Sequence, residues 1–95
     1  MSDMQQAHAR VRTDAAPRYL KQLASDLGRR VEPVETTQGT MLTIAGGTCL
    51  LTATGDSLLL HAAAPTTEGL DRVKDVVGGQ LELFGARNEL TVSWT

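Results

Sequence analysis

The chain of 95 residues has little of what several common protein classes require. It holds one cysteine, Cys49, which excludes an internal disulfide and a cysteine-rich zinc site, because both need at least two thiols. A lone thiol is typical of a reducing compartment, so we expect a cytoplasmic protein. The longest apolar runs, 58–60 and 62–64, are far shorter than the ~20 residues of a membrane-spanning helix, and the polar first six residues lack a signal core. We expect no membrane association.

Aromatic residues are also scarce, with only Tyr19, Phe84 and Trp94 in the whole chain. Nucleic-acid binding by base stacking needs aromatics among basic residues, and the sequence pI is near 5.5, so we expect no nucleic-acid partner. The charge is uneven, because residues 1–30 carry six basic and three acidic residues and the remainder three basic and eight acidic. The basic first helix is either a solvated surface or a docking site for an acidic partner or a phosphate.

Residues capable of catalysis or metal binding are few. The softer metal ligands are His8, His61 and Cys49, and His8 falls in a terminus without clear periodicity. Cys49 and His61 lie on neighbouring predicted strands, but neither a third metal ligand nor a group to orient the histidine is evident. The glycines do not have the spacing of a nucleotide-binding loop. We therefore predict no catalytic site, no metal site and no cofactor.

Two helices are predicted from apolar residues at helical spacing. The first covers about 14–28, with Thr13 or Asp14 as its N-cap, Pro17 in its first turn and Gly28 as a left-handed C-cap. The second begins at Thr66 or Thr67 and ends near residue 85, with an apolar stripe at Leu70, Val73, Val76, Val77, Leu81 and Phe84. The pair Gly78-Gly79 in its middle indicates close packing against a neighbouring backbone, or else a kink or a break in the helix.

Between the helices the apolar period shortens to two, which predicts four strands: 31–37, 40–45, 48–54 and 57–63. Turns are expected at Gln38-Gly39, Gly46-Gly47 and Gly55-Asp56, and Pro33 indicates that the first of these strands lies at a sheet edge. Alternation at 90–95 predicts a last strand, whereas residues 1–12 are expected to be a loose N-terminus before a single domain at 13–95.

These elements predict an α+β fold, a two-layer sandwich of order α-β-β-β-β-α-β with both helices on one face of a mainly antiparallel sheet. The opposite face would carry Met41, Thr43, Leu50 or Cys49, Thr52, Leu59 and His61, which is more apolar than a solvated face needs. We expect something to cover it, and a homodimer is the simplest cover.

Several separated segments resemble one bacterial family. They are residues 18–23, 46–51, Gly55-Asp56, 75–77, 81–82 with Phe84 and Arg87, and 89–94. In this order they are similar to the domain of unknown function 2218 family over about Thr13 to Trp94. The resemblance implies a small bacterial domain that occurs alone or joined to siderophore-interacting, flavin-dependent ferric reductases. The resemblance implies such a reductase as a partner.

The same resemblance bears on site residues. Similar proteins often carry histidines in both helices, where this chain has Asp26, Arg29 and Gln80, and arginine and glutamine are poor metal ligands. Arg18, Tyr19, Arg87, Glu89 and Trp94 match the family pattern. With His61 added, the candidate ligand-binding residues are Arg18, Tyr19, His61, Arg87 and Trp94, and their alternative role is structural.

Two functions remain open. The first is a non-enzymatic interaction module that self-associates through its sheet and serves iron or siderophore handling, as the resemblance implies. The alternative is a small-molecule or metal-binding domain with a pocket between sheet and helices near Tyr19, His61 and Trp94.

Overall fold

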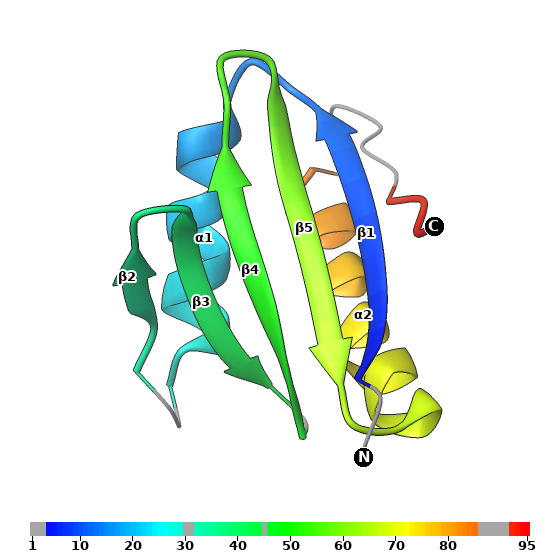
Figure 1. Ribbon diagram of the computed structural model, residues 1–95. Helices are drawn as coiled ribbons and strands as arrows, with labels where there is room; N and C mark the ends of the chain where they lie inside the picture. Colours follow the sequence, from blue (N-terminus) through cyan, green and yellow to red (C-terminus); the bar gives the residue numbers. More distant parts are fainter. Residues whose placement is uncertain (1–3, 30–31, 45, 86–91) are drawn as a thin grey trace.

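The computed structural model of the protein describes residues 4–29, 32–44, 46–85 and 92–95. Along the chain the elements are β1 (Gln5–Arg12), α1 (Ala16–Leu27), β2 (Val34–Thr36), β3 (Gly39–Ile44), β4 (Gly47–Ala53), β5 (Ser57–Ala64) and α2 (Thr67–Phe84). The strands form one antiparallel sheet in the order β1-β5-β4-β3-β2, and both helices cover the same face of it (Figure 1). The predicted α+β two-layer fold is confirmed.

The four predicted central strands form the expected meander, with β2 at one edge of the sheet. Gly55-Asp56 forms a turn in which the Thr54 N–H donates to the Ser57 carbonyl at 2.8 Å. Of the turn predicted at Gly46-Gly47, Gly47 is already the first residue of β4, where it pairs with Ile44. Gly46 has a φ of +87°, which a residue with a side chain rarely adopts.

The expectation of a loose N-terminus is wrong for residues 5–12, which form β1 along the free edge of β5. Ala7, Ala9 and Val11 point into the core, and these small side chains carry a weak hydrophobic signal. The predicted order is confirmed from α1 to α2, and β1 precedes it. The predicted last strand falls partly outside the described residues; within 92–95, Trp94 forms an isolated antiparallel bridge to Ala9.

The caps of the first helix differ from those predicted. Ala15 is the N-cap and has no capping side chain, while the Thr13 hydroxyl accepts from the Ala15 N–H at 3.1 Å. Gly28 is the C-cap but has a φ of −91°, so it is not left-handed. A Cβ at Gly28 would overlap the ring of Pro33, and this close approach explains the glycine. Pro17 lies in the first turn, as predicted.

The core lies between the helices and the sheet. Helix α1 packs over β3, β4 and β5, and α2 packs over β5, β4 and β1. On α2 the predicted stripe is buried except for Val76, which is exposed, and Phe84, which is half-buried. The Thr66 hydroxyl caps α2 by accepting from the Gly69 N–H at 3.0 Å. None of the described helices is long and apolar enough to cross a membrane.

Candidate ligand-binding face

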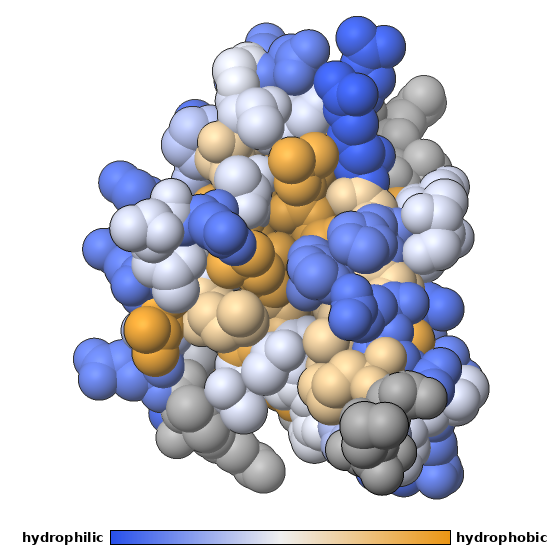
Figure 2. Space-filling view, in the orientation of Figure 1, coloured by the Kyte–Doolittle hydropathy of each residue, from blue (hydrophilic) through white to orange (hydrophobic). Residues whose placement is uncertain are grey.

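The face of the sheet that no helix covers is called the open face here. Because side chains alternate along a strand, it carries Gln6, His8, Arg10 and Arg12 of β1, Ser57, Leu59, His61 and Ala63 of β5, Thr48, Leu50 and Thr52 of β4, and Met41 and Thr43 of β3. Figure 2 shows hydrophobic side chains gathered over the middle strands of this face and hydrophilic ones along β1. The apolar face predicted from the sequence is therefore present, with Leu50 rather than Cys49 on it.

The strand register aligns these side chains in rows across the sheet. In one row His8 is opposite His61, His61 is opposite Leu50, and Leu50 is opposite Met41. In the next row Arg10 is opposite Leu59, which is opposite Thr52. Each row thus begins with a basic or titratable side chain on β1 and continues into leucine side chains on β5 or β4.

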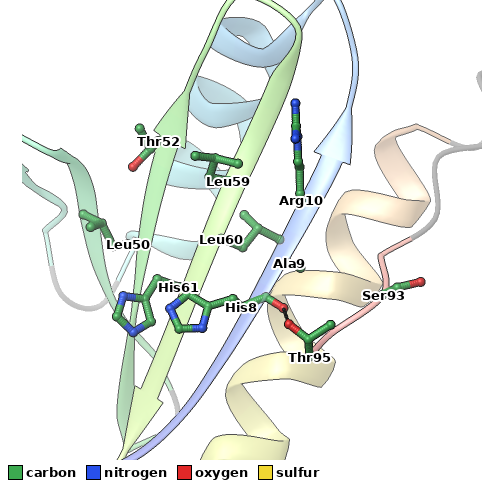
Figure 3. A pocket seen from close by; sticks show the side chains of 10 residues that line it. All are labelled: His8, Ala9, Arg10, Leu50, Thr52, Leu59, Leu60, His61, Ser93 and Thr95. Carbon is green, nitrogen blue, oxygen red and sulfur yellow. Dashed lines mark hydrogen bonds between the residues drawn. The ribbon is translucent and has the colours of Figure 1, made fainter.

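Between these rows the open face is hollowed. The hollow has a volume of about 480 Å³ and is lined by His8, Ala9, Arg10, Leu50, Thr52, Leu59, Leu60, His61, Ser93 and Thr95 (Figure 3). The short side chains of Thr52, Ser93 and Thr95 leave room beside the longer ones. This volume lies within the ~300–1,000 Å³ range of sites for small molecules.

Two stacked histidines stand at one end of the hollow. The rings of His8 and His61 have centroids 4.1 Å apart and planes inclined by 22°. The N–H and C=O of His8 both bond to Thr95, at 3.0 and 2.8 Å, so they point away from β5. His8 and His61 are therefore a non-hydrogen-bonded pair, the cross-strand position at which side chains come closest.

The environment of His61 favours the neutral imidazole. Its Nε2 lies 3.0 Å from Oε1 of Gln6, which is two residues before His8 on β1. Burial, and secondly the positive charge that His8 carries when protonated, lower the pKa of His61 below 6.5. A neutral ring can both stack on a ligand and exchange hydrogen bonds with it.

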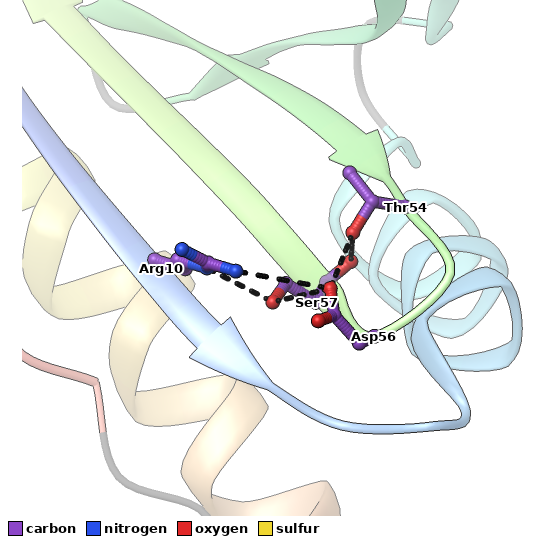
Figure 4. Close-up of polar contacts among 4 residues, drawn as sticks. All are labelled: Arg10, Thr54, Asp56 and Ser57. Carbon is purple, nitrogen blue, oxygen red and sulfur yellow. Dashed lines mark hydrogen bonds and ion pairs between the residues drawn. The ribbon is translucent and has the colours of Figure 1, made fainter.

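Arg10 stands at the opposite end and belongs to a polar cluster around the β4–β5 turn (Figure 4). Its Nε donates to the Ser57 hydroxyl at 3.0 Å, and its Nη2 lies 3.8 Å from the Asp56 carboxylate. Hydroxyls of Ser57 and Thr54 donate to Asp56 at 3.2 and 3.3 Å. These two hydrogen bonds, followed by the charges of Arg10 and Arg12, hold the pKa of Asp56 below its usual 3.8.

The C-terminal segment forms the wall of the hollow beyond β1. Ser93 and Thr95 line the hollow, whereas Val92 and Trp94 alternate with them and lie against Gly78 of α2. The Thr95 hydroxyl also donates to the His8 carbonyl at 3.3 Å. This wall is thus held by β1 on one side and by α2 on the other.

The structure does not bring together the five residues predicted as a ligand site. His61 lines the hollow, but Tyr19 is buried in the core beneath α1, on the other side of the sheet. Arg18 is exposed on α1, Trp94 faces α2, and Arg87 lies outside the described residues. Buried core side chains lie between the sheet and the helices, and the hollow lies on the opposite face of the sheet.

His8 and Arg10, which line the hollow, were missed because their strand was not recognised. The alternation of alanine and valine with His8, Arg10 and Arg12 was the available signal. Because the inward side chains of β1 are small, its sequence resembles that of an unstructured terminus.

Cys49 and His61 are on neighbouring strands, as predicted, but on opposite faces of the sheet. Burial raises the pKa of Cys49 to about 12, outweighing a hydrogen bond with the His61 backbone that lowers it. The thiol is therefore protonated at neutral pH and is not a nucleophile.

The helix positions singled out by the resemblance do come together. The Gln80 amide donates to Asp26 at 3.3 Å, and Arg29 lies 4.0 Å from the same carboxylate. The side chains of Gln80 and Arg29 therefore both interact with the Asp26 carboxylate. Within the described residues, no group of three or more His, Cys, Asp or Glu side chains could hold a metal ion.

Comparison with known proteins places the chain in a family. A family model described as "Uncharacterized protein conserved in bacteria (DUF2218)" matches residues 8–95. The fold is similar to that in the NMR structure of PA4090 from Pseudomonas aeruginosa, with a TM-score of 0.77, 24% identity, and coverage of 95% of this chain and 94% of that chain. No curated protein matches the chain.

Proposed function

The chain belongs to the DUF2218 family of bacterial proteins, and we propose that it is a non-enzymatic domain that binds a small molecule on the open face of its sheet. The hollow of about 480 Å³ carries this proposal. It combines an apolar floor, Leu50 and Leu59, with a few polar groups at its ends, which is the usual composition of a small-molecule site. Binding there needs no rearrangement of the helices.

Self-association through the same face is a second candidate. The row of His61, Leu50 and Met41 continues to Val34 of β2, whose exposed fraction of 59% is large for an apolar residue. A second copy would cover this end of the face. A dimer that covered the whole open face would also have to bury Arg10 and Arg12 of β1 in each copy, which costs the desolvation of charged groups. We therefore rank the small molecule first.

The test of the small-molecule function is a ligand screen followed by NMR of the isotopically labelled domain. The screen includes a flavin and a ferric siderophore, because siderophore handling is the context that the sequence resemblance implies. We expect a ligand that raises the melting temperature and shifts the amide resonances of residues 8–10, 50–52 and 59–61. Shifts confined to the helices would place binding elsewhere and contradict the proposal.

A matched pair of variants strengthens this test. Leu59→Ser removes part of the floor of the hollow, whereas Leu83→Ser changes a leucine on α2 with an exposed fraction of 68%. Binding should be lost in the first variant and retained in the second. Sedimentation velocity on the same samples distinguishes self-association, since a dimer that dissociates in Leu59→Ser without any ligand would favour the second candidate.

A further inference from the structure

We propose that the ligand of this hollow is a small apolar molecule that carries one anionic oxyacid group, with the anion bound at Arg10. This inference rests on the proposed function and specifies its ligand. Three features of the described residues support it: the sign of the charges around the hollow, the hydrogen-bonding capacity left on Arg10, and the distance between the rows of side chains.

The charged side chain that lines the hollow in the described residues is basic. Arg10 lines the hollow with a permanently charged guanidinium. None of the residues that line the hollow in the described part of the chain is acidic. The nearby Asp56 lies at the β4–β5 turn and is not among the residues that line the hollow, and two hydroxyls donate to its carboxylate. An anionic ligand therefore matches the hollow in charge, and a cationic ligand does not.

Arg10 retains donors for such an anion. A guanidinium has five N–H groups, and only the one on Nε donates to a hydroxyl, that of Ser57. The approach of Nη2 to Asp56, at 3.8 Å, is an exposed ion pair, and pairs of this kind are weak. The Arg10 side chain has an exposed fraction of 62%. A carboxylate or sulfonate can thus bind the remaining N–H groups without displacing a strong partner.

The apolar part of the ligand is placed by the strand register. Leu59 is directly opposite Arg10, and Leu50 lies in the neighbouring row with His61. Neighbouring rows on one face of a sheet are about 7 Å apart, which is the length of a small ring system or a short alkyl chain. An anion at Arg10 therefore directs the body of the ligand across the two leucines towards the neutral imidazole of His61.

The experiment compares two probes that share a ring system and differ in charge: 8-anilinonaphthalene-1-sulfonate and the neutral N-phenyl-1-naphthylamine. Their affinities are measured by fluorescence titration of the full chain. We expect the sulfonate to bind at least about tenfold more tightly, since a charge-assisted hydrogen bond contributes this much. Arg10→Gln should reduce this ratio to about one, because the anion loses its charge-assisted hydrogen bond. Arg12→Gln, on the same strand and face but outside the hollow, is the matched control.

The outcomes separate this inference from the proposed function. Equal affinities of the two probes for the natural chain, or an Arg10→Gln variant that keeps the preference for the sulfonate, would overturn the anionic ligand while leaving the binding hollow in place. Failure of both probes to bind would contradict the hollow itself. If Arg10→Gln does not fold, the comparison of the two probes on the natural chain still tests the anionic ligand. The variant Leu59→Ser tests the hollow itself: it must bind neither probe, while its amide spectrum remains that of a folded protein.

Discussion

The indole nitrogen of Trp94 lies 3.2 Å from the point that a Cβ on Gly78 would occupy. This close approach joins the C-terminal segment to the middle of α2. Because Ser93 and Thr95 flank Trp94 and line the hollow, one glycine in the helix layer helps to position a wall on the far side of the sheet. The glycine pair was predicted to pack closely against a neighbouring backbone; at Gly78 the close neighbours are instead the side chains of Trp94 and Val92. At Gly79 nothing lies within 4 Å of the corresponding point.

The two adjacent glycines give a direct test of this packing. Gly79→Ala should raise the free energy of unfolding by about 1 kcal/mol, because alanine is the better helix former and meets no neighbour. For a domain of this size that is a rise in melting temperature of about 4–8 °C. Gly78→Ala should gain less or lose stability, since Trp94 must move, and should weaken ligand binding. Equal effects in thermal denaturation would contradict the packing of Trp94.

Neighbouring leucines on β5 test which face of the sheet is the core. Leu60 has an exposed fraction of 1% and points towards the helices, whereas Leu59 has an exposed fraction of 36% on the open face. Leu60→Ala should cost about 2–5 kcal/mol of the free energy of unfolding, as buried leucines do. Leu59→Ala should cost less than about 1 kcal/mol and weaken binding instead. Urea denaturation measures both, and the reverse ranking would mean that the faces are exchanged.

The thiol of Cys49 should report on unfolding. Since burial raises its pKa to about 12, almost no thiolate exists in the folded protein at pH 8. A disulfide reagent such as dithionitrobenzoate should react with it slowly in buffer and rapidly in denaturing urea. Colorimetry at a series of urea concentrations should follow the same transition as circular dichroism. Rapid labelling of the folded chain would show that the thiol is accessible and that the inner face of β4 is misplaced.

The stability of the domain should depend on pH through His61. In the folded state the pKa of His61 lies below its ordinary value of 6.5, which applies to the unfolded chain. At a pH between the folded-state pKa and 6.5, the unfolded chain therefore binds more protons than the folded one. The free energy of unfolding should therefore fall as the pH is lowered through about 6.5, and level off below the pKa of the folded state. Chemical denaturation across pH 4–8 measures this, and His61→Gln should remove the part of the dependence near pH 6.5 while leaving the fall at the acid end, to which Asp56 contributes.

His8 provides a second measurement on the same pair. Replacing it in His8→Gln removes a group that becomes positively charged beside His61. The pKa of His61 should rise but remain below 6.5, because its burial, the larger cause, persists. NMR titration of the imidazole resonances measures the pKa of His61. A pKa of His61 that does not change would mean that the two rings are not neighbours in solution.

Much of the fold could be predicted from the sequence, because it follows from local patterns. Alternating Leu58, Leu60 and Ala62 predicted β5, and glycines between short runs predicted the turns. The alternation in β1 is a weaker signal, since Ala7 and Ala9 bury little surface and alanine has a low preference for strands. What makes this segment a strand is its pairing with β5, about fifty residues away along the chain.

The candidate site depends even more than the fold on contacts between segments that are distant in the sequence. His61 was found as a lone histidine on a strand, but its partner His8 and the basic Arg10 come from the strand that pattern alone did not predict. Tyr19 and Trp94 were grouped with His61 because they match a family pattern, yet burial in the core separates Tyr19 from His61 by the thickness of the sheet.

The sequence by itself therefore determined the helices, the central strands and the α+β class of this protein, because helical and strand periodicities are properties of neighbouring residues. It also determined that one face of the sheet would be more apolar than a solvated face needs. Only the tertiary structure decided which residues share that face, since the register between β1 and β5 sets His8 beside His61 and Arg10 beside Leu59. The hollow exists because two distant segments, β1 and the residues around Trp94, add to the edge of the meander.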